Sequence, residues 1–228
     1  MATRSVRPVR SYVLRQGRTT PAQQRALEQL FPRYGVPFAE RPLNPLELFG
    51  RAAPLVLEIG SGMGETTLAI AQAHPEADFI AIEVHGPGVG SLLNAIEREA
   101  LGNLRVIRHD ALEVLEHMIG DQGLAAIHLF FPDPWPKKRH HKRRLVQPQN
   151  AALMARKLAS GGVLHAATDW PDYADHMQRV FAAEPLLEPV ASGFTARPAT
   201  KFAARGARLG HPLRDLYFRR RQKPPAAR

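Results

Sequence analysis

The chain has 228 residues, 44% of them hydrophobic and 23% charged, which is typical of one globular domain with a substantial core. Its 31 lysine and arginine residues outnumber 21 aspartate and glutamate residues, and the net charge of +10 favours a polyanionic partner such as nucleic acid. The absence of cysteine excludes disulfides, thiolate metal sites and cysteine nucleophiles, and no apolar run reaches the roughly 20 residues of a membrane span.

Residues 1–50 are expected to form a basic, partly flexible N-terminal arm and a helix, and residues 51–228 the main domain. The first 20 residues contain five arginines and no acid, which fits either an organelle transit peptide or an arm that contacts nucleic acid. Residues 21–31 have the composition of a helix. Residues 33–51 are interrupted by proline and glycine and are expected to link or cover the domain.

From Pro54 onward, short apolar runs alternate with amphipathic stretches, a pattern typical of alternating strands and helices. Strands are expected at 54–60, 79–85, 104–110, 124–133 and 163–169, with edge strands at 186–190 and 214–220. Helices are expected at 64–75, 87–102, 111–120, 147–162 and 173–183. Five successive strand–helix steps predict an α/β fold with a doubly wound, mostly parallel, seven-stranded Rossmann-like sheet.

An acidic residue stands at or beside the predicted carboxyl end of each of the five parallel strands. These residues are Glu58, Glu83, Asp110, Asp133 and Asp169. Because open α/β sheets bind ligands at the carboxyl ends of their strands, we expect these side chains to border one site. Carboxylates gathered at one edge repel each other, so a cationic ligand explains their placement better than a structural role does.

The loop after the first predicted strand is rich in glycine, which permits a tight turn and close approach of a ligand. Its glycines are Gly60, Gly62 and Gly64. The loop departs from the dinucleotide-binding pattern, since Glu65 replaces the third glycine and Glu58 would repel a phosphate. Glu58 would instead attract the cationic groups of S-adenosylmethionine, with Glu83 at the ribose and Asp110 beside the adenine. The alternative is an ordinary tight turn with solvated acids.

The segment FFPDPWPKKRHHKRRL (130–145) places Asp133 between two prolines, which restrict the backbone and hold the carboxylate. Asp133 is expected beside the sulfonium methyl group, and Trp135 either stacks on a base or packs beneath the loop. His140 and His141 are expected to belong to the basic run that follows, and no metal site is expected. The cations expected to contact phosphates are Lys137, Lys138, Arg139, Lys142, Arg143 and Arg144.

The C-terminal part of the chain is also basic. From Arg197 onward there are ten lysines and arginines and one acid, Asp215. If the fold brings them together, the N-terminal arm, the basic run and this tail would line one groove that matches a nucleic acid backbone.

Several stretches together resemble the bacterial tRNA guanine-N7 methyltransferase family, from about Pro54 to Phe218. They are LVLEIGSGMGE, AIEVHGPGVGSLL, FFPDPWPKKRHHKRRLVQP, TDWPDYADHM and TKFAARGARLGHPLRDLYF. The resemblance implies a class I methyltransferase fold and a cytoplasmic enzyme that transfers a methyl group from S-adenosylmethionine to N7 of guanine 46 in the tRNA variable loop. It implies tRNA as the partner and no membrane association, and it leaves monomer and homodimer equally open.

The same resemblance assigns roles to individual positions, with Asp133 at the catalytic position. The cofactor-binding positions are the three loop glycines with Glu58, Glu83, Asp110 and Ala111. The substrate-binding positions are Lys137, Asp169, Thr200, Lys201, Phe202 and Arg205. The sequence departs from the family pattern at Ala203, where glutamate is usual, so any hydrogen bond made by that glutamate must be lost or replaced.

Two other functions are compatible with these residues. A methyltransferase that acts on an exocyclic amine of DNA or RNA also uses an acid, a proline and an aromatic residue after the fourth strand. A non-catalytic, basic RNA-binding protein could retain the fold alone, although the glycine loop, Glu83 and Asp110 argue against it. The charge distribution disfavours a small-molecule methyltransferase.

Overall fold

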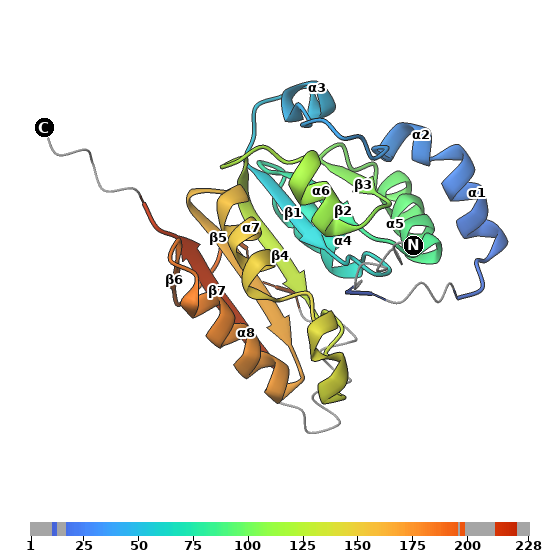
Figure 1. Ribbon diagram of the computed structural model, residues 1–228. Helices are drawn as coiled ribbons and strands as arrows, with labels where there is room; N and C mark the ends of the chain where they lie inside the picture. Colours follow the sequence, from blue (N-terminus) through green and yellow to red (C-terminus); the bar gives the residue numbers. More distant parts are fainter. Residues whose placement is uncertain (1–10, 13–16, 196, 199–212, 223–228) are drawn as a thin grey trace, which may run out of the picture.

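A computed structural model of the chain describes residues 11–12, 17–195, 197–198 and 213–222. They form a seven-stranded sheet with the order β3-β2-β1-β4-β5-β7-β6 (Figure 1). The parallel strands are β1 (Leu55–Ile59), β2 (Asp78–Ile82), β3 (Leu104–Ile107), β4 (Leu124–Phe130) and β5 (Leu158–Thr168). The antiparallel strands are β7 (Arg214–Arg220) and β6 (Leu187–Pro189). This sheet confirms the predicted fold class, including the two additional strands near the C-terminus.

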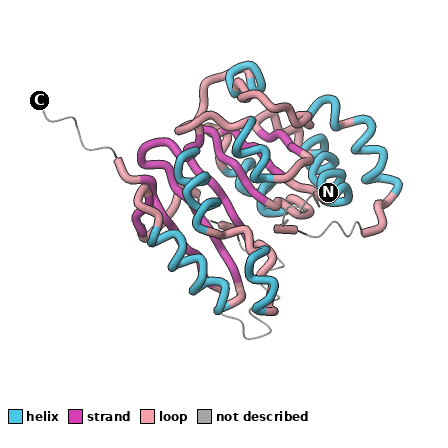
Figure 2. Tube along the Cα trace, viewed as in Figure 1, coloured by secondary structure: helices cyan, strands magenta, loops and turns pink. Residues whose placement is uncertain are grey.

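Helices cover both faces of the parallel part of the sheet and give three layers (Figure 2). One face carries α6 (Ala111–His117), α7 (Pro148–Lys157) and α8 (Pro171–Ala183), and the other carries α4 (Glu65–Ala73) and α5 (Gly86–Arg98). Every residue of β1 is buried, because both faces of the strand are covered. Leu57 packs on the side of α6, α7 and α8, and Val56 packs on the side of α4 and α5. Burial on both faces explains why the strands are nearly continuous apolar runs, and each fully buried leucine or isoleucine contributes about 1.5–3 kcal/mol.

The segment before β1 packs against the domain. It contains α1 (Pro21–Gln29), α2 (Phe31–Tyr34) and α3 (Pro45–Phe49). Thr20 begins α1 with a capping box that it shares with Gln23. α1 lies so close to α5 that a Cβ atom on Gly90 would come within 2.6 Å of the Gln23 carbonyl oxygen. The Val36 amide donates to the Val106 carbonyl over 2.8 Å, which covers part of the edge of β3.

The predicted boundary between the fourth main helix and the fifth strand was wrong. α7 ends at Lys157, and β5 begins at Leu158 and contains the glycine pair that was expected to end the helix. The register between β4 and β5 shifts near Leu124, and a Cβ atom on Gly162 would come within 2.9 Å of the Leu124 carbonyl oxygen. The glycines therefore mark a β-bulge, where close backbone approach leaves no room for a side chain.

β2, β3 and β4 each end three residues earlier than predicted, at Ile82, Ile107 and Phe130. Glu83, Asp110 and Asp133 consequently lie in the turns that follow these strands. There, the turn conformation directs each side chain instead of the regular alternation of a strand.

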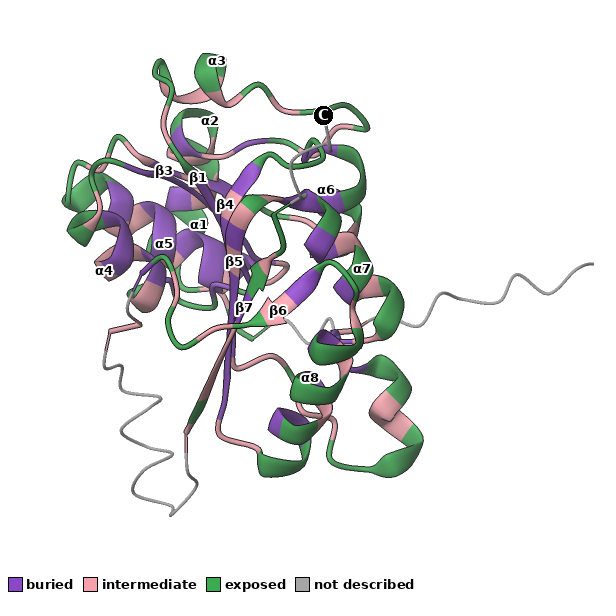
Figure 3. Cartoon of the chain, turned by 90° about the vertical axis from the view of Figure 1, so that its left-hand side faces the viewer, coloured by how far each residue is buried: buried purple, intermediate pink, exposed green. Residues whose placement is uncertain are grey.

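Burial follows the layered arrangement (Figure 3). Buried residues concentrate on the strands and on the inward sides of the helices, whereas the outer surfaces of the helices are exposed. In the parts of the chain that the structure describes, no helix has the length and apolar character required to span a bilayer.

Candidate active site

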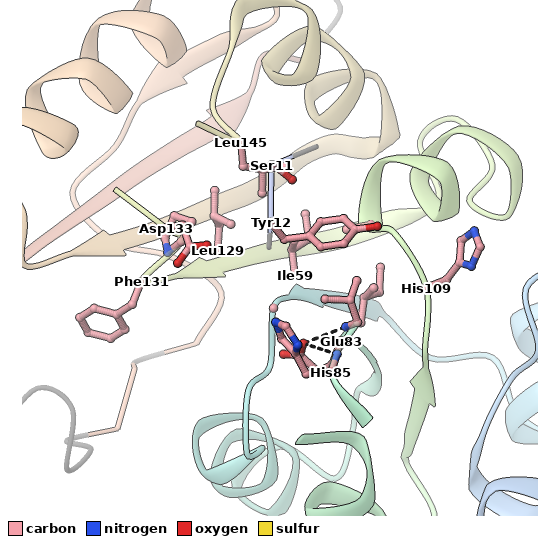
Figure 4. A pocket seen from close by; sticks show the side chains of 15 residues that line it. Ser11, Tyr12, Ile59, Glu83, His85, His109, Leu129, Phe131, Asp133 and Leu145 are labelled. Atoms are coloured by element: carbon pink, nitrogen blue, oxygen red, sulfur yellow. Dashed lines mark hydrogen bonds between the residues drawn. The ribbon is translucent and has the colours of Figure 1, made fainter. Parts of the chain in front are cut away.

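Two adjoining cavities lie at the carboxyl ends of β1, β2 and β4. The first has a volume of about 190 Å³, and Glu83, His85 and Asp133 are among the side chains that line it (Figure 4). The second has a volume of about 290 Å³ and lies between the glycine-rich loop and the end of β4. Gly60 and Phe131 line both cavities, so the two spaces are neighbours along one edge of the sheet.

The glycine-rich loop forms one wall of the second cavity. Gly60, Gly62 and Gly64 have φ angles of +76°, +57° and +85°, which are readily accessible only to glycine. The loop rests directly on α5, because a Cβ atom on Gly88 would come within 2.4 Å of the Gly62 carbonyl oxygen. The result is a backbone surface that a ligand can approach closely.

Glu83 ties this loop to the turn after β2. Its Oε2 accepts a hydrogen bond from the Gly62 amide over 2.8 Å. Its Oε1 accepts from the amides of Val84 and His85 over 2.8 and 2.9 Å (Figure 4). A carboxylate has about four acceptor positions, so about one position remains for a hydroxyl group of a ligand. Glu83 thus both shapes the first cavity and can accept from its occupant.

Glu58 lines the second cavity and is almost completely buried, with 4% of its surface exposed. Burial raises the pKa of Glu58 to about 7, because desolvation disfavours the carboxylate. A cation placed beside the carboxylate would offset part of this cost and favour ionisation. The environment is therefore suited to a positively charged ligand group.

Asp110 lies beside the first cavity but does not line it. Its Oδ1 accepts from the Leu112 amide over 2.8 Å and caps α6. Its neighbours His109 and Ala111 line the cavity. The His109 ring stacks on Phe38 with centroids 3.8 Å apart, so the segment before β1 contributes to this wall.

Asp133 stands at the end of β4, on the side of the first cavity opposite Glu83 (Figure 4). The residue as a whole is exposed, yet burial of its carboxyl group raises the pKa of Asp133, and the nearby His85 opposes this shift. The Trp135 indole Nε1 donates to the Ser11 carbonyl over 3.2 Å, and the Arg143 guanidinium lies 5.0 Å from its ring centroid. In this structure the indole packs between its own loop and the N-terminal segment.

Of the six cations that were expected to contact phosphates, Arg144 is buried. Its side chain is 1% exposed, its Nε donates to the Pro134 carbonyl over 2.9 Å, and its Nη2 forms an ion pair with Asp172. Its guanidinium also lies 4.8 Å from the Tyr173 ring centroid. Arg144 therefore clamps the loop that carries Asp133. The five cations that remain exposed are Lys137, Lys138, Arg139, Lys142 and Arg143.

The described arginines of the C-terminal tail bond within the protein, and the other five cations of the tail lie outside the described residues, so the expected groove stays a prediction. Arg219 and Arg221 pair with Glu188, and Arg214 pairs with Asp175. Arg197 pairs with Asp215, and Arg220 donates to the main-chain carbonyls of residues 156 and 158. These contacts stabilise the β6–β7 side of the sheet.

The expected substrate-binding positions are only partly described. Lys137 is exposed immediately before the 3₁₀ helix Lys138–Arg143, and Asp169 is partly buried between β5 and α8, outside both cavities. Four further positions and Ala203 lie outside the described residues; the four are Thr200, Lys201, Phe202 and Arg205.

Sequence reasoning missed a group of buried polar residues on β4, β5 and β7. His128 and His165 are each 1% exposed in the middle of strands, and His165 bonds to Asp215. The available signal was a histidine within each of the apolar runs LAAIHLF and VLHAAT, since buried polar side chains require partners.

Comparison with solved structures supports the same fold. The crystal structure of the 16S rRNA methyltransferase KamB covers 78% of this chain and 92% of its own, with a TM-score of 0.55 and 17% identity. That of the aminoglycoside resistance methyltransferase NpmB1 covers 76% and 90%, with a TM-score of 0.53 and 14% identity. At these identities, the likeness concerns the fold alone.

Comparison of sequences also shows the family to which the chain belongs. The family described as "Putative methyltransferase" matches residues 52–216. A tRNA (guanine-N(7)-)-methyltransferase of Nitrosomonas eutropha is 57% identical over 92% of this chain and 96% of its own. A tRNA (guanine-N(7)-)-methyltransferase of Aromatoleum aromaticum is 56% identical over 95% of this chain and 85% of its own length. One of Bordetella pertussis is 55% identical over 93% of this chain and 85% of its own length. With a family match over most of its length and relatives of more than half identity, the chain belongs to the tRNA (guanine-N(7)-)-methyltransferase family.

Proposed function

We propose that this protein transfers a methyl group from S-adenosylmethionine to N7 of guanine 46 in the variable loop of tRNA. The observation that carries the proposal is the placement of Asp133. It lines a cavity that adjoins the glycine-rich loop, and the exposed cations of residues 137–143 follow it directly in the same loop. Relatives of more than half identity bear the name of this activity.

The residues of the two cavities fit this cofactor. Bound S-adenosylmethionine supplies a methyl group activated by a sulfonium. Glu58 offers a buried carboxylate to a cationic group, and Glu83 has an acceptor position for a ribose hydroxyl. Ala111 and the backbone of the glycine loop leave space for close contact, and Asp110 acts through α6, which it caps. All these positions lie at one edge of the sheet.

Asp133 is assigned to the acceptor base. Guanine N7 carries a lone pair and no proton, so the reaction requires alignment more than a general base. The methylated base is cationic, and a carboxylate near it stabilises the charge that develops during transfer. Asp133 therefore acts by hydrogen bonding and electrostatics instead of removing a proton.

The exposed cations of residues 137–143 are assigned to the tRNA backbone. Five cations on one short helix and its first flanking residue repel one another, and phosphate contacts relieve this repulsion. Lys137, Asp169 and the segment beginning at Thr200 complete the substrate-binding set. A tRNA substrate implies a cytoplasmic location, and sedimentation of the free protein and its tRNA complex decides between monomer and homodimer.

The test is methyl transfer from labelled S-adenosylmethionine to total tRNA, followed by nuclease digestion and mass spectrometry of the nucleosides. The expected product is 7-methylguanosine, a nucleoside with a fixed positive charge, and mapping of the modified nucleotide in intact tRNA should place it at position 46. A label on an exocyclic amine would give a neutral product and support the rival methyltransferase. Binding of tRNA without binding of S-adenosylmethionine in calorimetry would support the non-catalytic alternative.

A further inference from the structure

A row of polar side chains crosses the sheet from the cofactor cavity toward the C-terminal strand. Glu58, His128, His165 and Tyr217 are successive partners in the register of β1, β4, β5 and β7. The rings of His165 and Tyr217 stack with centroids 4.2 Å apart. The Thr195 hydroxyl bonds to His128 Nε2 over 3.1 Å, so the segment that contains Thr195 covers this row.

Arg197 follows in the same segment and is anchored to β7. Its Nε and Nη2 donate to the two carboxylate oxygens of Asp215 over 3.0 and 3.1 Å, and its side chain is 7% exposed. Asp215 Oδ1 also bonds to His165 Nε2 over 2.7 Å. Burial works to raise the pKa of Asp215, but the bonds from His165 and Arg197 prevail and lower it to about 2. The cluster is thus a two-point, charge-assisted anchor.

The other face of this anchor touches the active site. The Arg197 guanidinium carbon lies 5.5 Å from the centroid of the Phe131 ring. Phe131 lines both cavities, and its ring points away from Glu83 and His85 (Figure 4). Its φ of +50° is unusual for a bulky residue and needs support from its surroundings. Part of this support is the bond from its amide to the Ala167 carbonyl over 2.8 Å.

The positions of these residues along the chain connect the two substrate segments. Phe131 precedes the proposed catalytic Asp133 by two residues, and Arg197 precedes Thr200 by three. A contact between Phe131 and Arg197 therefore couples the turn that presents Asp133 to the start of the expected substrate-binding stretch.

We propose that Arg197, held by Asp215 and His165, is a positioning residue that fixes Phe131 as the wall between the two cavities and thereby aligns Asp133 with the methyl donor. This assignment rests on the proposed function. Neither Arg197 nor Asp215 needs to touch the reacting atoms. Their effect falls on the geometry of transfer, where a displacement of about 1 Å is enough to lower the rate about 100-fold.

Arg197→Lys is the principal test, because lysine keeps the charge for Asp215 but cannot make two parallel bonds or lay a flat guanidinium on a ring. We expect kcat for tRNA methylation to fall about 10- to 100-fold. The Kd for S-adenosylmethionine should stay within about threefold, since Arg197 lines neither cavity. The Phe131 amide should exchange its hydrogen faster than in the wild type.

Arg51→Lys is the matched control. Arg51 donates two bonds to the buried Asp78 over 3.0 and 2.7 Å at the beginning of β2, the sheet edge opposite the cavities. Its kcat should equal that of the wild type. Asp215→Asn should lower kcat like Arg197→Lys. Because both residues belong to one anchor, the kcat of the double variant should be no lower than that of the more impaired single variant.

An unchanged kcat in Arg197→Lys would overturn the proposal, as would rate losses of the two single variants that multiply in the double variant. An equal loss in Arg51→Lys would also overturn it, because the effect would then be general destabilisation. If the wild type methylates no tRNA, the proposed function fails, whereas the exchange of the Phe131 amide still tests the anchor. Unchanged exchange in Arg197→Lys would refute it.

Discussion

The loops after β1 and after β4 border the same cavities but reach positive φ angles in different ways. The first uses glycine at each such position, namely Gly60, Gly62 and Gly64. The second places Phe131 and Trp135 at φ angles of +50° and +46°. For residues with a side chain this conformation costs about 1–2 kcal/mol each.

The difference reflects what each loop presents. The first presents its backbone, so a side chain would only obstruct the ligand. The second presents side chains, and the contacts of Arg144 and Arg197 offset the backbone strain. Side chains that are needed at a site can thus be kept in an unfavourable conformation, provided that buried residues behind them supply the stabilisation.

Removing the carboxylate of the second loop should have the largest effect. We expect Asp133→Ala to lower kcat about 100- to 1000-fold, since it removes the group that stabilises the developing charge. Calorimetry should show a Kd for S-adenosylmethionine within about threefold of the wild type. Turnover that survives this substitution would remove Asp133 from the mechanism.

The acid beneath the first loop should make cofactor binding depend on pH. With a folded-state pKa of about 7, Glu58 is mostly protonated at pH 6 and mostly ionised at pH 8. If the carboxylate binds the cationic ligand, affinity should rise about tenfold between these pH values. Glu58→Gln should lower the affinity at pH 8 and abolish its rise with pH. A wild-type affinity that is flat with pH would contradict this role.

The Glu58 carboxyl should also make the stability of the free protein depend on pH. Stability should fall as pH rises, whereas affinity for the cofactor should increase. The folded-state pKa of Glu58 lies above the ordinary value of 4.5, so the free protein should lose stability as pH rises from 4.5 to 7. A shift of this size corresponds to roughly 3 kcal/mol. Urea unfolding of wild type and Glu58→Gln across this pH range measures the loss, which should be absent in the variant.

Releasing the clamp behind the second loop should destabilise the protein. Arg144→Met keeps much of the side-chain volume but leaves the Pro134 carbonyl and Asp172 without their donor, at a cost of about 1–3 kcal/mol. The exposed Lys142→Met should change the free energy of unfolding by less than about 0.5 kcal/mol. Equal effects in the two variants would show that Arg144 is not a clamp.

Crowding the first loop should give a similar effect through the backbone. The Cβ atom of Gly88→Ala would meet the Gly62 carbonyl oxygen, so we expect a loss of about 1–3 kcal/mol and weaker binding of S-adenosylmethionine. Gly102→Ala, where no atom lies within 4 Å of the new Cβ, is the control. Wild-type affinity in Gly88→Ala would show that the loop can shift without consequence.

The smallest effect should come from the exposed cations. Replacing Lys137 and Lys138 with glutamine should weaken tRNA binding, and it should reduce the slope of log K against log salt by about 0.7 per lost contact with a single strand. Filter binding over a range of salt concentrations measures this slope. An unchanged slope would mean that these lysines do not contact phosphate.

The sequence by itself determined the order of strands and helices, the seven-stranded sheet and the glycine-rich loop. These features depend on local periodicity and on the backbone preferences of single residues, and both can be recognised in a single sequence. The boundary between α7 and β5 could not be predicted from the sequence. The glycines near residue 162 form a bulge that depends on pairing with β4.

Only the tertiary structure decided which charges face solvent and which are buried. Arg143 and Arg144 are adjacent in one basic run, yet Arg143 is exposed and Arg144 is enclosed with Asp172. Arg197 likewise belonged to a basic tail by sequence and is buried against Asp215 in the fold. The pKa of Glu58 also depends on what covers it. Solvation and ion pairing depend on distances between segments far apart in the chain, and a linear pattern of charges carries no such distances.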